Sequence, residues 1–381
     1  MNRKVTLLYI SLACVLSMQA QTRQQMGGVY YAYPEGPSAK TGTFGTATYV
    51  MSDSLSVPQG YAPFYISHYG RHGSRWMPKD DRYVWICKHF EDENNLTPLG
   101  LQVKGMLQRV WENAKGNGGK LSKLGALQHQ GIAHRMFERY PQIFAVGNAV
   151  KARSSVVDRC AKSMQAFTSE LHSLQPGLNL DVKTDSADMA WIAYVSPEVK
   201  ALENRTHVQA QVLPRRFLLQ LFKDVSKVDE PLKLMTEMHT VASSIQDVGL
   251  NFSSYPQDIE DGLNALFTDD EFRAIYDANN LRMAINNGTV ATNEDIPARS
   301  AISLWQNIEA EADRALRSVK SSATLRFGHD TALYRLLSLL FDVNVPPAGA
   351  REEASLVVLG DEMEKMDRVV PMAANLQMIF Y

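Results

Sequence analysis

Short apolar strands that end at glycine turns, each with a helical pattern next along the chain, constrain the fold of this protein most. Residues 61–67 form one such strand and run into a turn that contains Gly70 and Gly73. Residues 322–327 form another, which runs into Gly328. Strands that alternate with helices favour a sheet with parallel pairing and helices packed on its faces. In such sheets ligands bind at the carboxyl ends of the strands, where these turns lie.

The segment 157–174 has the clearest helical periodicity. Its apolar residues recur at spacings that alternate between three and four, which places them on one face of a helix. They are Val157, Cys160, Met164, Phe167, Leu171 and Leu174. Ser154 and Ser155 precede this helix as expected capping residues, and Pro176 follows its end. A short strand is expected just before it, at residues 150–153.

The remaining patterns divide the chain into regions. Helices are expected at 97–114, 121–140 and 331–341, and helical patterns dominate residues 198–320. Final strands are expected at 356–359 and 376–380. We therefore predict an α/β fold with a mostly parallel central sheet flanked by helices. Its regions are a signal peptide at 1–20, an irregular N-terminal arm at 21–58, a discontinuous α/β core at 59–195 and 320–381, and an inserted helical cap domain at 196–319.

The N-terminus has the pattern of a secretory signal peptide. A basic start at Arg3 and Lys4 precedes a mostly apolar run that ends near Ala20. The run is too short to span a bilayer, and no other long apolar segment follows, so no stable membrane insertion is expected. Cys14 leaves lipid attachment open as a minor alternative. We expect a secreted or periplasmic protein.

Composition bears on the partners of the protein and on its disulfide bonds. The formal net charge is −2, so binding of nucleic acid is not expected, and any anion site depends on local clustering of basic residues. After removal of the signal peptide, Cys87 and Cys160 remain. Either a disulfide between them or two separate thiols agrees with the sequence.

The segment Arg71-His72-Gly73-Ser74-Arg75 is the strongest indication of chemistry. Arginine presents planar pairs of donors that match phosphate oxygens. A neutral imidazole can attack phosphorus as a nucleophile, provided that its other ring nitrogen is held by an acceptor. We expect the Gly73 carbonyl to be that acceptor. The alternative is a solvated basic turn without function.

Two more positions lie at strand-to-helix turns. Arg159 lies near the start of the 157–174 helix, where free N–H groups already attract anions. By itself it is better explained as a solvent-facing helix residue. His329 can donate to a phosphate oxygen, and Asp330 can act as a general acid. Asp330 is also a good N-cap for the helix that follows, and the two roles are compatible.

These motifs resemble those of the histidine acid phosphatases, a family that includes the phytases. The similar segments are Arg71-His72-Gly73-x-Arg75, the glycine- and arginine-containing helix from Leu121 to Tyr140, Arg153-Ser154-Ser155 with Asp158-Arg159, and Gly328-His329-Asp330. The resemblance implies that His72 is phosphorylated, that Asp330 is the proton donor, and that four residues bind phosphate. These four are Arg71, Arg75, Arg159 and His329. It also places Lys79 where phytases have a substrate-binding lysine, although a plain surface charge is as good an interpretation.

The late motif carries further information. The branch that acts on multiple inositol polyphosphates often has His-Ala-Glu there, whereas this chain has His329-Asp330 and so resembles the phytases and general acid phosphatases. The expected function is hydrolysis of a small phosphate ester, such as phytate or another inositol phosphate, without a metal or other cofactor. A non-catalytic phosphate-ligand receptor and a phosphomutase remain alternatives. A metal site at His68 and His72 is disfavoured, because four-residue spacing aligns ligands on a helix, not at a strand end. The oligomeric state is not indicated.

Overall fold

The computed structural model describes residues 22–32, 60–290, 292–318, 320–340 and 366–381. The predicted signal peptide, most of the predicted N-terminal arm and the predicted strand at 356–359 lie outside these ranges. In the described part of the arm, Gln25–Tyr30 forms 3₁₀ turns with a kink at Gly28, and Met26, Gly27 and Gly28 are buried.

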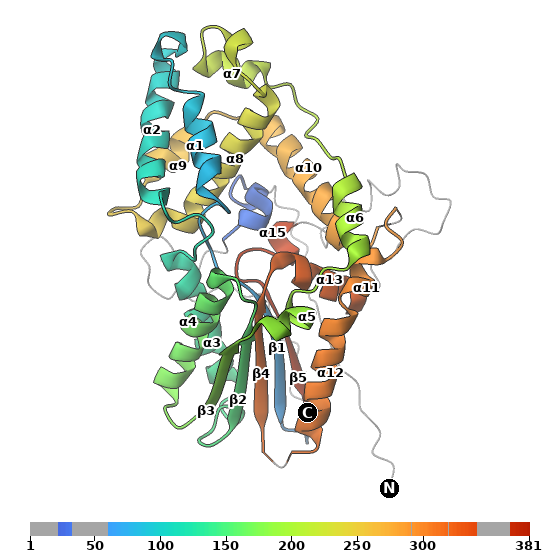
Figure 1. The fold of residues 1–381 in the computed structure, drawn as a ribbon. Helices are drawn as coiled ribbons and strands as arrows, with labels where there is room; N and C mark the ends of the chain where they lie inside the picture. Colours follow the sequence, from blue (N-terminus) through green and yellow to red (C-terminus); the bar gives the residue numbers. More distant parts are fainter. Residues whose placement is uncertain (1–21, 33–59, 291, 319, 341–365) are drawn as a thin grey trace.

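A five-stranded sheet forms the lower half of the molecule (Figure 1). Its strands are β1 (Tyr65–Arg71), β2 (Ala149–Ser154), β3 (Asn179–Thr184), β4 (Ser322–Gly328) and β5 (Asn375–Phe380), in the order β3-β2-β4-β1-β5. The four strands β1 to β4 pair in parallel, and β5 pairs antiparallel with β1. The predicted α/β fold with a mostly parallel sheet is confirmed.

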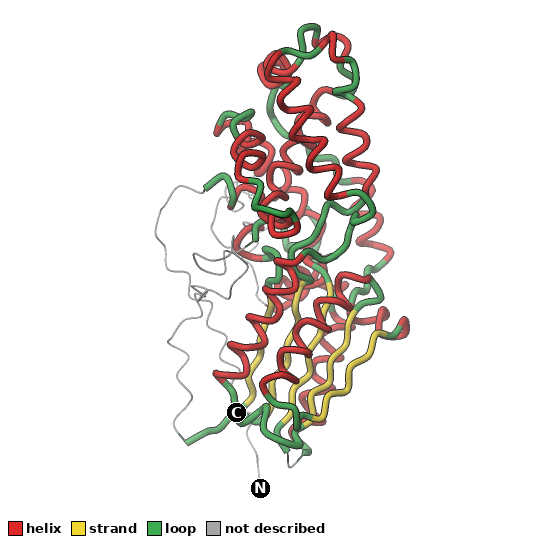
Figure 2. Tube along the Cα trace, turned by 90° about the vertical axis from the view of Figure 1, so that its left-hand side faces the viewer, coloured by secondary structure: helices red, strands yellow, loops and turns green. Residues whose placement is uncertain are grey.

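Helices cover both faces of this sheet. On one face, α3 (Lys123–Arg139) and α4 (Asp158–Leu174) pack an apolar layer against the strands, and Phe167 and Phe327 lie at its centre. On the other face lie α5 (Met189–Ile192), α12 (Ile302–Leu316) and α13 (Asp330–Leu340). Seen from the side, the sheet lies between these helix layers, and the helical half of the molecule stands above the carboxyl ends of the parallel strands (Figure 2).

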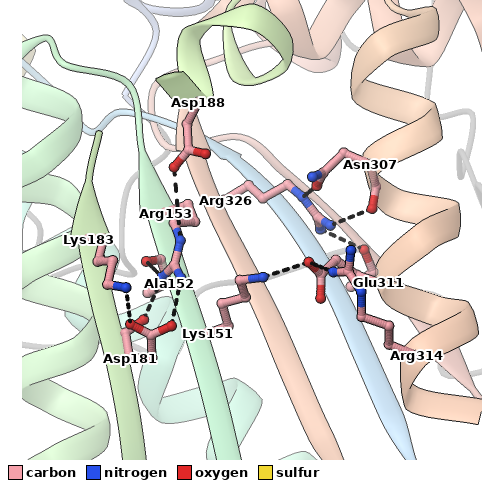
Figure 3. Close-up of polar contacts among 11 residues, drawn as sticks. Lys151, Ala152, Arg153, Asp181, Lys183, Asp188, Asn307, Glu311, Arg314 and Arg326 are labelled. Carbon is pink, nitrogen blue, oxygen red and sulfur yellow. Dashed lines mark hydrogen bonds and ion pairs between the residues drawn. The ribbon is translucent and has the colours of Figure 1, made fainter. Parts of the chain in front are cut away.

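A polar network lies on the second face of the sheet (Figure 3). The buried Arg326 donates to Ser67 Oγ and to Asn307 Oδ1, both at 2.9 Å. Nearby, Lys151 pairs with Glu311 of α12 at 2.6 Å. These polar contacts anchor α12 to the strands in addition to the apolar packing of its Leu304 and Ile308.

The helical half has a core of its own. Its helices are α1 (Asp80–Lys88), α2 (Pro98–Ala114), α6 (Pro197–Arg205), α7 (Arg215–Leu221), α8 (Pro231–Val248), α9 (Gln257–Asn264), α10 (Asp269–Asn287) and α11 (Ile296–Ser300). One apolar cluster joins α1 and α2 with α7 to α10. The packing therefore differs from the predicted region boundaries in two places. Helices α1 and α2, from the segment assigned to the α/β core, pack into the helical half, whereas α12, from the segment assigned to the insertion, covers the sheet.

Several element boundaries differ from those expected. Strand β1 begins four residues later than expected and continues to Arg71, so Gly70 is part of the strand and the turn starts at His72. The edge strand β3 was not predicted from the sequence. Ser154 belongs to β2, and the N-cap of α4 is Val157 without a side-chain cap. The first helix after β4 begins at Asp330 itself, one residue earlier than expected. Lastly, α15 (Met366–Val369) is a short helix before β5.

Candidate active site

The two predicted motif turns meet at the carboxyl ends of β1 and β4. Arg71 is paired with Gly328 in the parallel register of these strands. The His72 N–H donates to the Gly328 carbonyl at 3.0 Å. The segments carrying His72 and His329 are therefore neighbours in the fold, although 257 positions separate them in the sequence (329 − 72). Their imidazole rings lie 5.7 Å apart, centroid to centroid.

His72 is held as a neutral imidazole. Its ring is buried, and Nδ1 lies 2.9 Å from the Gly73 carbonyl oxygen, as expected from the sequence. Since a carbonyl only accepts, Nδ1 carries the proton and Nε2 presents its lone pair. Burial is the largest cause that lowers the pKa of His72 well below its usual value, and the neighbouring Arg71, Arg159 and Arg75 lower it further. The ring is therefore available as a nucleophile even in acid.

Arg71 is held through Nη1, whereas its Nε and Nη2 have no hydrogen-bond partner among the described residues. Its Nη1 donates to the carbonyls of Val29 and Val370, both at 2.6 Å. Its Nη2 pairs with Asp330 Oδ2 at 3.2 Å. The guanidinium is completely buried, and these contacts leave it little freedom to rotate. Such preorganisation favours a phosphate that develops charge, because the donors need not reorganise when it does.

Asp330 faces the Arg71 guanidinium as a carboxylate. Burial raises its pKa, but Arg71, Arg75 and His329 lower it more, so the net shift is below the usual value of an aspartate. Its Oδ1 accepts from the Thr331 N–H at 2.9 Å, which leaves Oδ2 towards Arg71. The expected N-cap role of Asp330 is wrong, because α13 begins at Asp330 and its first backbone bond, from the Leu333 N–H, goes to the His329 carbonyl at 3.0 Å. The role of Asp330 as proton donor stays a prediction.

His329 and Arg159 form the other side of the cluster. Arg159 Nη2 lies 3.5 Å from His329 Nδ1, and Ser155 Oγ lies 3.2 Å from Nε2. Because a guanidinium only donates, His329 accepts at Nδ1 and carries its proton on Nε2. Burial and Arg159 lower the pKa of His329 to about 4. Ser155, expected to cap α4, instead holds this ring.

Arg75 completes the basic cluster. Its Nη1 donates to the Trp76 carbonyl at 2.8 Å, and its guanidinium lies over the Tyr30 ring at 5.3 Å from the centroid. Its positive charge acts on His72, Arg71, Arg159 and Asp330 alike. Three guanidinium groups and two imidazoles thus converge at one point in the fold.

Helix α3 supports the loop that carries these residues. The Ser74 N–H donates to Gln128 Oε1 at 2.8 Å, and the Ser74 carbonyl accepts from both the backbone and the hydroxyl of Ser122. The approach is close enough to require glycine, since a Cβ at Gly73 would lie 2.3 Å from the Gly125 carbonyl oxygen. A Cβ at Gly125 would in turn lie 2.2 Å from the Ser74 carbonyl oxygen.

This close approach predicts opposite effects for two helical glycines. Gly125→Ala should destabilise the protein by about 1–3 kcal/mol through overpacking, because backbone atoms, not a flexible side chain, meet the new methyl group. Gly105→Ala in α2, where a Cβ would meet nothing within 4 Å, should stabilise it by about 0.5–1 kcal/mol. Urea unfolding of both variants checks this. Equal effects would show that the Gly125 contact is not tight.

Lys79 is the one predicted site residue that does not join the cluster. It is exposed and lies at the N-cap of α1, and no contact of its side chain with the phosphate cluster is found among the described residues. Its substrate-binding role stays a prediction. The described residues contain no group of three or more His, Cys, Asp or Glu that could hold a metal ion. Cys87 and Cys160 are both free thiols.

Sequence reasoning missed several residues of the site. The backbone carbonyls that hold Arg71 belong to segments without a motif, so nothing in the sequence indicated them. Asp247, on α8, is completely buried and close enough to Arg75 and Arg71 to interact with them. The only signal in the sequence is the polar pair Ser243 and Asp247, one turn apart on α8.

The chain was compared with known proteins in sequence and in structure. No protein-family model matches the chain. The multiple inositol polyphosphate phosphatase 1 of Gallus gallus is 23% identical over 275 residues, which is 69% of this chain and 59% of the chicken protein. The multiple inositol polyphosphate phosphatase of Bifidobacterium longum, crystallised with inositol hexasulfate, superposes with a TM-score of 0.64 at 16% identity, over 92% of this chain and 87% of the other. The phytase from D. castellii gives 0.63 at 12% identity, over 94% of this chain and 75% of the other.

These likenesses confirm the resemblance to the histidine acid phosphatases, and they show that the chain has the fold of those enzymes. The two TM-scores are nearly equal, so the fold does not separate the inositol polyphosphate branch from the phytases. The curated relative is by name an inositol polyphosphate phosphatase, whereas the His329-Asp330 motif predicted the phytase pattern. Among the described residues, no helix has the length and apolar character needed to cross a membrane.

Proposed function

We propose that this chain is a phosphomonoesterase that acts through a phosphohistidine on His72, with Asp330 as the general acid. The observation that carries the proposal is the convergence of a neutral, carbonyl-held His72 with Arg71 and Asp330 at the joined ends of β1 and β4. Arg71, Arg75, Arg159 and His329 bind the phosphate. The relationship to inositol polyphosphate phosphatases and phytases supports the same activity.

The reaction has two displacements. His72 Nε2 attacks phosphorus in line, the bond from phosphorus to the ester oxygen breaks, and Asp330 gives its proton to the leaving alkoxide. Water then attacks the phosphohistidine, Asp330 takes a proton from it, and inorganic phosphate and free His72 are formed. The three guanidinium groups stabilise the charge on the transferred phosphoryl group in both steps.

Because the pKa of Asp330 is lowered in the free protein, its carboxyl group must obtain the proton that it donates when the substrate binds. A carboxylate paired with Arg71 is a poor proton donor until an anion neutralises that cation. A phosphate ester has a second pKa near 6, so its monoanion can bring the proton into the site. We therefore expect activity to favour acidic pH, where the substrate monoanion is abundant.

Release of inorganic phosphate tests the proposal most simply. Hydrolysis of p-nitrophenyl phosphate and of inositol hexakisphosphate by the purified protein is expected at acidic pH. A receptor that only binds phosphate ligands would release none, and a phosphomutase would transfer the group to an added sugar phosphate in preference to water. Comparison of the two substrates by kcat/KM then shows whether inositol phosphates are preferred.

The inositol phosphate preference and the export of the protein are part of this proposal. Support for the former comes from the chicken and bacterial relatives, and support for the latter from the basic and apolar N-terminus. N-terminal sequencing of the protein recovered from the periplasm or medium of an expressing bacterium tests export. A mature chain that begins near residue 21 is expected, and retention of Met1 in the cytoplasm would contradict it.

A further inference from the structure

Asp247 is a buried carboxyl group that the proposed mechanism does not use. It lies near the end of α8 and has no solvent exposure. Within the part of the chain that the structure describes, neither of its carboxyl oxygens makes a hydrogen bond of normal geometry, although the Ser74 side chain lies close enough to lower its pKa. Burial of an unpaired polar group is costly, so such a group in a well-packed core calls for a physical explanation.

The groups that face Asp247 come from the end of β1, from the loop that follows it and from the segment after α8. They are Ser74, Arg75, Arg71 and Tyr255. Ser74 Oγ and Arg75 Nε are themselves buried without hydrogen-bond partners among the described residues. Both backbone polar groups of Ser74 are held by α3 and its N-cap Ser122, which fixes the main chain that carries this side chain. The unsatisfied groups of the loop and of α8 therefore lie against each other.

The charge state of Asp247 decides what this arrangement does. Burial raises its pKa to about 8, although Ser74, Arg75 and Arg71 act in the opposite direction. At acidic pH the group is a neutral acid and does not attract the positive charges of the guanidinium groups strongly. As a carboxylate it would attract the same two arginines that the phosphate needs.

We propose that Asp247 is a positioning residue through which α8 sets the anion affinity of the site: the neutral acid leaves Arg71 and Arg75 to the phosphate, and the carboxylate competes for them. The inference rests on the proposed function in one respect, that Arg71 and Arg75 bind the phosphate. It gives the cap helix a part in setting the pH range of the enzyme.

The other groups of the site whose shifts are known do not change charge between about pH 7 and about pH 9. The pKa of His72 and that of Asp330 lie below this window, and that of His329 is about 4. Burial raises the pKa of Cys160 to about 11. Burial also raises the pKa of Tyr255, the remaining titratable group that faces Asp247.

Sulfate binding measured by calorimetry isolates the effect, because sulfate stays a dianion throughout this window and needs no turnover. In the wild-type protein its affinity should fall about tenfold between pH 7 and pH 9, as expected when ionisation of one group near pH 8 excludes the anion. In Asp247→Asn, a neutral isostere, the affinity should match the wild type at pH 6 and stay within about twofold up to pH 9.

Asp261→Asn is the matched control, since it removes an exposed carboxylate from the neighbouring helix α9 and should retain the wild-type slope. A flat wild-type profile, or an unchanged slope in Asp247→Asn, would overturn the inference. An affinity lowered equally at every pH would assign Asp247 a purely structural role. If sulfate binds as described but no ester is hydrolysed, the proposed function fails while this inference stands.

Discussion

Replacement of His72 with alanine is expected to abolish phosphate release while anion binding is retained. The neutral ring held by the Gly73 carbonyl is the nucleophile, whereas the lone pair of the other imidazole of the cluster, at His329 Nδ1, faces the Arg159 guanidinium. The three arginines remain in place, so sulfate should still bind. We expect kcat/KM to fall at least about 10³-fold, or about 4 kcal/mol of transition-state stabilisation.

The matched control is His172→Ala, which removes an exposed histidine from α4 and should leave activity unchanged. Sulfate calorimetry and thermal unfolding of His72→Ala show whether the site is intact. Turnover at more than a few per cent of the wild-type rate, in a variant that folds and binds sulfate, would mean that another group attacks the phosphorus.

Substitution of Asp330 by asparagine should slow cleavage according to the leaving group. An alkyl phosphate releases a strongly basic alkoxide and needs the proton, whereas p-nitrophenolate leaves without it. We expect kcat/KM for an inositol or alkyl phosphate to fall about 10²–10⁴-fold, and kcat/KM for p-nitrophenyl phosphate to fall far less. Because Asp330 also activates the water, p-nitrophenol should appear in a burst followed by slow turnover.

Asp158→Asn is the control for this variant, because it removes an exposed carboxylate that pairs with Lys162 at 3.2 Å on the first turn of α4. The loss of the Arg71–Asp330 pair is a second consequence of Asp330→Asn. It should raise sulfate affinity, since one negative charge leaves the anion site. Equal slowing for all leaving groups would argue that Asp330 positions Arg71 and does not act as an acid.

The sequence indicated the side chains of the site better than the contacts that hold them in place. Arg71, His72, Arg159, His329 and Asp330 lie at strand-to-helix junctions, and the geometry of parallel sheets is enough to bring such junctions together. The contacts that fix Arg71, at Val29 and Val370, come from backbone carbonyls. Any residue supplies a carbonyl, so no sequence pattern identifies them.

The fold was predictable where periodicity was strong and not where short elements carry little of it. The helix at 158–174 contains five of the six apolar positions that predicted it, the sixth being its N-cap Val157, and it was placed within one residue of its observed ends. The edge strand β3 has mostly exposed residues, so the alternation that identifies a half-buried strand is weak. Helices α1 and α2 pack far from their sequence neighbours in the sheet, because their apolar faces match those of α7 to α10. Local periodicity does not predict which helices α1 and α2 pack against.

Trapping of the phosphoenzyme tests the central claim most directly. The protein is mixed with ³²P-labelled substrate, quenched in alkali within milliseconds, digested and analysed for the labelled peptide. We expect an acid-labile, alkali-stable phosphoryl group on the peptide that contains His72, formed and lost fast enough to account for turnover. Full turnover with no label on His72, or with the label on another residue, would contradict the account.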